Sequence, residues 1–213
     1  MSCNGAVQTA LNCADGLWYR YTLRKDVCGC VLSSDEERAV VDGAVKTAAD
    51  MARQVMEQYG MISPEKLAEA MCLKLVYTTG ELREPYLYMG LYEPDTRTIT
   101  VNESAILLVS QFIAANDLEI ITPSADITRI VLFHEIFHAL EEKNPDIYTR
   151  SRMLERKLFG IFSYKRGLAG VSEVGAVHFS KIMAGISYSP CIFERYLLLA
   201  LGQLSIDFLP PKV

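Results

Sequence analysis

The sequence predicts an α+β fold that is mostly helical and contains a small antiparallel sheet. Apolar residues recur at helical spacing before residue 72 and again after residue 104. Between them, residues 75–102 are rich in β-branched and aromatic residues and contain turn signals. Helices, sheet and helices thus follow one another in separate blocks, which is typical of α+β domains.

Composition narrows the class of protein. The chain has 213 residues, half of them hydrophobic and 22% charged, as expected of a globular domain with a sizeable core. A net charge of −5 argues against direct nucleic-acid binding. No apolar run reaches the ~18 residues of a membrane span, and no secretory signal is visible, so we expect a cytoplasmic protein. In that compartment the six cysteines would be reduced thiols.

The expected organisation is an irregular, Cys-containing N-terminal extension, residues 1–33, followed by one domain, residues 34–213. The extension has no clear periodicity, and we expect it to pack on the domain. An alternative is a partner-docking arm, suggested by the aromatic and basic stretch 18–21.

Local signals place the elements. Ser34 opens a helix that Gly60 ends, and Ser63 with Pro64 starts a second helix that runs to about Cys72. Strands are predicted over 75–79, 86–92 and 98–102, with a turn at 93–97. Further helices are predicted over about 104–115, 123–143, 146–159, 172–187 and 190–204.

The informative motif is H-E-x-x-H, formed by His134, Glu135 and His138. Shuffling this composition would give roughly 0.003 matches, and the motif takes two of the three histidines in the chain. On a helix the two imidazoles lie about 40° apart on one face, as two zinc ligands require. Glu135 lies to the side, where it can act on a water as general base without being a ligand.

The surroundings of the motif strengthen the zinc prediction. Apart from the three motif residues, all residues from Ile130 to Leu140 are apolar, so this helix is expected to be buried nearly all round. Ionisable side chains there are costly unless they are paired or bind a metal. The alternative is a pair of satisfied core histidines beside a salt-bridged glutamate.

A catalytic zinc needs a third protein ligand. The metzincin pattern is excluded because Glu141 and Asn144 replace its glycine and histidine. Glu173 is favoured because it stands on an apolar stretch whose small residues let its helix approach closely. The next candidates are Glu155 and then His178. Glu141, Glu142 and Asp146 follow them.

The order of elements resembles that of the ImmA/IrrE-type metallopeptidase family. The matching pieces are residues 63–70, a hairpin with Gly90 and residues 99–102, the helix 131–140, and Glu173-x-x-Ala176-x-x-Phe179. The resemblance implies a minimal zincin-like fold with a buried HExxH helix, with His134, His138 and Glu173 as zinc ligands and Glu135 as catalytic acid/base. It also implies intracellular cleavage of helix-turn-helix repressors. Phe137 departs from the family, which often has glycine there.

These observations predict a zinc metallopeptidase that cleaves a cytosolic protein, for example a regulatory or repressor protein. Residues 98–102 would offer a sheet edge to the substrate, and Tyr148, Tyr164 or Tyr188 could donate to the oxyanion. One alternative is a non-catalytic, zinc-dependent sensor or protein-binding module on the same fold. Another is hydrolysis of a small amide by the same residues.

Overall fold

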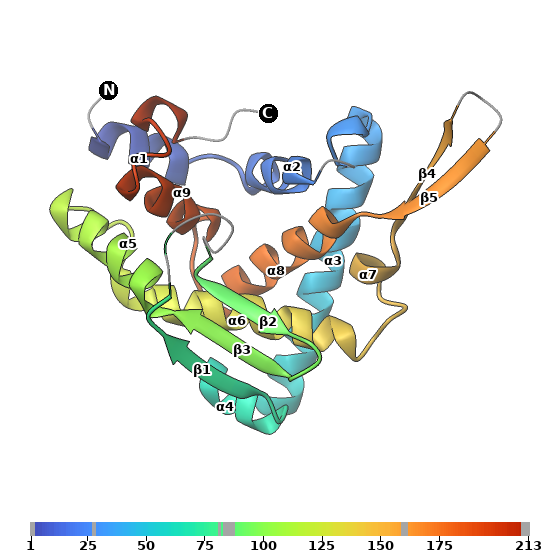
Figure 1. Ribbon diagram of the computed structural model, residues 1–213, viewed down its shortest axis with the longest axis horizontal. Helices are drawn as coiled ribbons and strands as arrows, with labels where there is room; N and C mark the ends of the chain where they lie inside the picture. Colours follow the sequence, from blue (N-terminus) through green and yellow to red (C-terminus); the bar gives the residue numbers. More distant parts are fainter. Residues whose placement is uncertain (1–2, 27–28, 81, 83–87, 159–161, 210–213) are drawn as a thin grey trace.

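The computed structural model describes residues 3–26, 29–80, 82, 88–158 and 162–209 (Figure 1). Helices dominate these ranges, and the strands form one three-stranded sheet and a separate two-stranded hairpin. The mostly helical α+β class predicted from the sequence is thereby confirmed. None of the helices in these ranges combines the length and the apolar character needed to cross a membrane.

The N-terminal segment is helical, so the prediction of an irregular extension is wrong. It forms α1 (Cys3–Leu11), α2 (Asp15–Lys25) and a short 3-10 helix, Gly29–Val31. Several of its side chains are buried in one core with residues of α5 and α9. These are Ala6, Val7, Ala10, Trp18, Tyr19 and Leu23. Trp18 and Tyr19 therefore help to build the core, with Tyr21 packed against it and Arg20 exposed, and this segment is not a free arm.

The next two helices follow their capping signals. In α3 (Ser34–Tyr59), Ser33 and Glu36 form a reciprocal capping box, and Gly60 ends the helix with a positive φ of 70°. In α4 (Pro64–Ala70), the Ser63 side chain accepts a hydrogen bond from the Lys66 backbone N–H. Both helices were predicted, from Ser34 and Gly60 and from Ser63 and Pro64, but the capping box of Ser33 with Glu36 was not.

The three-stranded sheet is mixed, not antiparallel as predicted. Its strands are β1 (Lys74–Thr78), β2 (Gly90–Glu93) and β3 (Thr98–Asn102), in the spatial order β1-β3-β2. β2 and β3 form the predicted antiparallel hairpin, but β1 pairs parallel to β3. β3 is therefore the central strand, and the prediction that residues 98–102 form an edge is wrong, since β2 occupies that edge.

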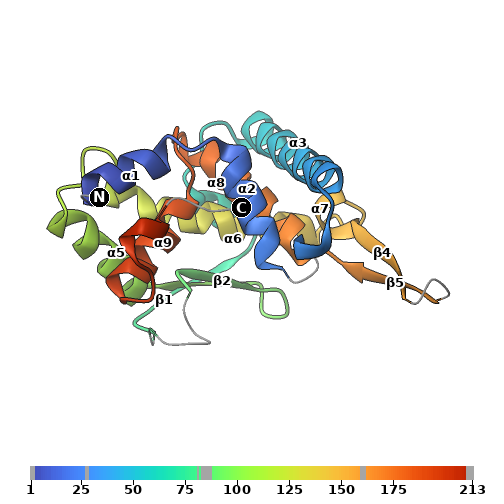
Figure 2. The ribbon, with the colours of Figure 1, turned by 90° about the horizontal axis from the view of Figure 1, so that it is seen from above.

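The remaining long helices form the body of the domain. They are α5 (Glu103–Ala115), α6 (Ile127–Glu142), α8 (Ala169–Ala184) and α9 (Cys191–Ala200), with 3-10 turns at Ser124–Asp126 and Ile206–Phe208. All four overlap predicted helices. Figure 2 shows α6, α8 and α3 on one side of the sheet, and α8 packs along both α3 and α6. This arrangement brings α6 between the sheet and α8.

Residues 146–159 are not the predicted helix. Of this range the structure describes residues 146–158, and these contain the short α7 (Tyr148–Ser151) and the strand β4 (Met153–Leu158), which pairs antiparallel with β5 (Phe162–Gly167). Figures 1 and 2 show these two strands projecting from the body as an arm. We call residues 153–158 and 162–167 the β4–β5 arm.

Candidate metal centre

Helix α6 carries the H-E-x-x-H motif through the centre of the molecule. Its buried residues lie all round the helix and include Ile130, Val131, Phe133, Ile136 and Phe137. The two histidines are partly buried, whereas Glu135 is only 7% exposed. The predicted burial of this segment is confirmed, so its polar side chains need partners within the fold.

Those partners come from α8. Nε2 of His134 lies 3.3 Å from one carboxylate oxygen of Glu173, and Nε2 of His138 lies 3.6 Å from the other. The two Nε2 atoms are 3.4 Å apart. Within the described residues, these three side chains form the group of His, Cys, Asp or Glu that could hold a metal ion. The three ligands predicted from the sequence thus converge.

The spacing of these atoms fits a small tetrahedral cation. With metal–ligand bonds of about 2.0–2.1 Å, a tetrahedral zinc site separates its ligand atoms by about 3.3–3.4 Å. Two imidazole nitrogens and one carboxylate also form the donor set of a three-ligand catalytic zinc site, which leaves one position open. The half-exposed Glu173 side chain lies on the accessible side of this group.

Electrostatics at the site favour a cation as well. Burial alone would raise the pKa of Glu173, but the hydrogen bond from His134 and the charges of both histidines lower it to about 2. Burial alone would lower the pKa of His138, yet Glu141, Glu173 and Glu135 raise it to about 9. Positive charge between these side chains is therefore stabilised.

Two further residues hold the His138 ring in place. Nδ1 of His138 lies 3.3 Å from the carboxylate of Glu141 and 3.1 Å from the Ser172 hydroxyl, which itself donates to Glu141. Glu141 is 2% exposed. Contact at Nδ1 fixes the ring so that Nε2 faces Glu173, as carboxylate–histidine pairs do in zinc sites. Glu141, considered above as a third ligand, lies outside the group of three and contacts His138 instead, and the contact of Ser172 was not predicted.

Glu135 lies beside the edge strand β2. A Cβ atom on Gly90 would come within 2.9 Å of the Glu135 carboxylate and 2.6 Å of Val131, so only glycine permits this approach. Burial raises the pKa of Glu135, while the two histidines and the Tyr92 backbone N–H oppose that rise. We call His134, His138 and Glu173 the triad. The carboxyl group of Glu135 is thus held next to the triad without being part of it.

Phe137 does not crowd the site. It is fully buried and packs 5.5 Å, centroid to centroid, from Phe179. A Cβ on Gly175 would come within 2.6 Å of the Phe137 ring, so the large side chain on α6 is matched by a missing one on α8. This pairing allows α6 and α8 to approach each other closely.

The other candidate ligands lie elsewhere. Nδ1 of His178 is 2.7 Å from the Tyr19 hydroxyl, away from the triad. Glu142 accepts a hydrogen bond from the Tyr92 hydroxyl. Asp146 is not part of the metal-binding group. The Glu155 backbone lies in β4, but its side chain falls outside the described residues.

Open space reaches the triad from two directions. One cleft of about 230 Å³ contains His134, Glu135 and Glu173 in its lining, together with apolar residues of α6, α8 and α9. A second, of about 400 Å³, contains His138, Glu141 and Ser172, and is bounded by Arg150 and the start of α8. The triad therefore lies between two hollows that an extended chain could occupy.

Two of the three tyrosines predicted as oxyanion donors, Tyr148 and Tyr188, pack against other parts of the fold. The Tyr148 ring packs against Gly43, and Tyr188 packs against Phe193. The Tyr164 side chain lies outside the described residues. Tyr88, which was not among the predicted donors, lines the first cleft with Glu135. Its position just before β2 is the signal that could have identified it.

The cysteines support no second metal site in the part of the chain that is described. Cys13, Cys72 and Cys191 are free thiols, as predicted, and they lie in different parts of the fold.

Comparison of the chain with models of protein families, with curated proteins and with solved structures gives no match.

Proposed function

We propose that this chain is a zinc-dependent metallopeptidase that hydrolyses peptide bonds in a cytosolic protein. The observation that supports this most is the convergence of His134, His138 and Glu173 beside the separate, buried carboxyl of Glu135. Metal ligands alone would suit a structural site, but structural zinc sites are usually closed by four protein ligands. Three ligands, a neighbouring acid and an adjoining cleft suit catalysis.

His134 and His138, with Glu173, would hold the zinc, and Glu141 with Ser172 would keep His138 aligned. A zinc ion held there would supply Lewis acidity, for the scissile carbonyl and for the attacking water. Glu135 takes the proton from the attacking water and passes it to the leaving amine. Because Glu135 is buried beside Gly90, its carboxyl stays directed at the same point through both transfers.

The edge strand β2 gives a place for the substrate backbone. It lies at the outer side of the sheet, next to α6, and borders the first cleft through Gly90. A peptide added to this edge would run past Glu135 toward the second cleft. Tyr88 lies at the start of that path and can donate its hydroxyl to a developing oxyanion.

The experiment compares wild-type protein with Glu135→Gln, both loaded with zinc, on a library of quenched peptides and on unfolded proteins. The variant keeps the shape and the metal ligands but lacks the base. We expect wild type to cleave and the variant to lose about 10²–10⁴-fold in kcat. Equal zinc content in the two proteins is the control, measured by elemental analysis.

If both zinc-loaded proteins cleave equally, Glu135 is not the base and the proposed mechanism is wrong. If neither cleaves any peptide or protein, the zinc-dependent binding module becomes the better account. Cleavage of small amides but not of peptides would instead favour the small-amide alternative.

A further inference from the structure

The β4–β5 arm concentrates positive charge in an otherwise acidic protein. The arm contains one acidic residue, Glu155, and four cations, Arg156, Lys157, Lys165 and Arg166, which gives it a net charge of +3. Arg150 and Arg152 directly precede it, so the whole segment 150–167 contains six cations. This segment has a net charge of +5 in a chain whose net charge is −5, so the other residues together carry −10. Such a local excess of one sign is an electrostatic feature that a partner of opposite charge can recognise.

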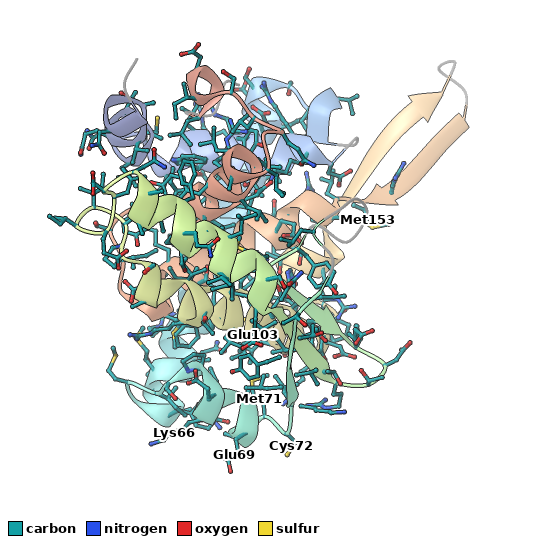
Figure 3. The ribbon with its side chains drawn as sticks, turned by 60° about the vertical axis from the view of Figure 1, so that its left-hand side comes forward. Lys66, Glu69, Met71, Cys72, Glu103 and Met153 are labelled. Atoms are coloured by element: carbon teal, nitrogen blue, oxygen red, sulfur yellow. The ribbon has the colours of Figure 1, made fainter. Side chains whose placement is uncertain are left out.

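The arm is built as a separate projection. Six residue pairs join β4 to β5, from Met153 with Gly167 to Leu158 with Phe162. Six residues extend about 20 Å at about 3.3–3.4 Å per residue. Figure 3 shows Met153 at the base of the arm and the strands leading away from the body. Met153, Arg152 and Arg166 at the base are exposed.

The register also places unlike residues on the two faces of the arm. Residues directly opposite each other in an antiparallel pair share a face. One face carries mainly charged and small residues, namely Met153, Glu155, Lys157, Ser163, Lys165 and Gly167. The other carries apolar and aromatic residues with two arginines, namely Leu154, Arg156, Leu158, Phe162, Tyr164 and Arg166. The second face suits a polypeptide with both acidic and apolar side chains.

The base of the arm is continuous with the metal centre. The Leu168 backbone N–H donates to the carbonyl of Arg152, which joins the two ends of the arm at the start of α8. Gly167 and Leu168 then line the second cleft with His138. A chain that leaves the triad through this cleft therefore passes the base of the arm.

We propose that the β4–β5 arm is an exosite that binds an acidic segment of the protein substrate, a few residues away from the bond to be cleaved. This inference rests on the proposed peptidase function, since it treats the occupant of the arm as part of the substrate. Duplex nucleic acid is disfavoured because the body of the protein, at −10, repels a polyanion that extends beyond the arm.

The test measures binding, so that it is independent of cleavage. The protein is zinc-loaded Glu135→Gln, and the probe is a labelled peptide of about twelve residues, long enough to follow the arm at about 3.3 Å per residue. Half of the probe residues are Asp or Glu, interspersed with Leu. A second probe has Lys at every acidic position, and a third is short duplex DNA. Fluorescence anisotropy at two salt concentrations gives Kd.

The arm variant is Arg156→Glu/Lys157→Glu/Lys165→Glu. Its matched control, Arg38→Glu/Lys46→Glu/Lys66→Glu, makes the same change in net charge at exposed positions of α3 and α4. We expect the acidic probe to bind more tightly than the Lys probe, and the arm variant to weaken it about tenfold or more. The control should change Kd far less, and added salt should weaken binding.

Equal Kd values for the arm variant and the control variant would overturn the inference. So would tighter binding of DNA than of the acidic peptide, lost in the arm variant, because the arm would then be a nucleic-acid site. Failure of the proposed function shows separately, as the absence of zinc-dependent cleavage by wild type, whereas failure of the exosite shows only in these Kd values.

Discussion

Helix α6 and the β4–β5 arm differ in where their charged residues lie and in the signs of those charges. On α6 the charged or ionisable side chains have mixed signs and are buried or partly buried, and each of His134, His138 and Glu141 contacts a named polar partner. On the arm the charged residues are many, and most have the same sign. A buried helix can hold reactive side chains in fixed positions, whereas a projecting hairpin with charges of one sign can attract a partner of opposite charge over a longer distance.

The largest expected effect is the loss of stability from Phe137→Ala. This side chain is fully buried between α6 and α8, and its removal leaves a cavity against Phe179. We expect the free energy of unfolding to fall by about 3–5 kcal/mol, measured by urea denaturation of the metal-free protein. The arm variant defined above is the control, with a change within about 0.5 kcal/mol. Similar losses in both would break the contrast between core and arm.

The next effect concerns the close approach of α8 to α6. Gly175→Ala puts a methyl group against the Phe137 ring, and we expect a loss of about 1–3 kcal/mol in the free energy of unfolding. Combining it with Phe137→Leu, which leaves room for the methyl group, should recover part of that loss. The measurement is a double-mutant cycle by chemical denaturation. Strict additivity of the two changes would show that the residues are not matched in size.

A smaller effect should follow from changing a residue that orients a ligand. Glu141→Gln removes the carboxylate that holds Nδ1 of His138. We expect zinc affinity to fall by about 10–100-fold, measured by competition with a chelator. Glu142→Gln, which alters the neighbouring acid that contacts Tyr92, is the matched control and should bind zinc like wild type. A larger loss in Glu142→Gln than in Glu141→Gln would contradict the assigned role.

The smallest effect concerns His178, which links α8 to α2. Burial lowers the pKa of His178 below its usual value. The negative charge of Asp15 opposes this shift, and the positive charge of Lys181 adds to it. The unfolded chain therefore binds a proton more readily than the folded protein, and stability falls as pH drops from above about 6.5. Metal-free His178→Gln should lose less stability than wild type between pH 7 and the lower pKa. An identical pH dependence would show that His178 titrates normally.

The parts of the fold that were predicted correctly have strong local causes. Ser34 and Gly60 predicted the two ends of α3, and both ends are capped locally, by Ser33 with Glu36 and by Gly60. His134, Glu135 and His138 are close in sequence, so the helical period alone places them together. Glu173 required a choice among several acids, and that choice rested on the small residues around it.

The parts that were missed depend on distant segments. Residues 153–158, Met-Leu-Glu-Arg-Lys-Leu, have high helix propensity, but pairing with β5 overrides this weak preference. The parallel pairing of β1 with β3 involves strands separated by the whole of β2, so no local pattern reveals it. The N-terminal helices are short, and their stability comes from burying Trp18 and Leu23 in a core formed by later residues.

The central claim is that His134, His138 and Glu173 together hold one zinc ion. Elemental analysis of purified wild type and Glu173→Ala, after supply of zinc and removal of excess, tests it most directly, with Glu142→Ala as the matched control. The account predicts about one zinc per chain in wild type and in the control, and clearly less in Glu173→Ala. Full zinc content in Glu173→Ala, or none in wild type, would contradict it.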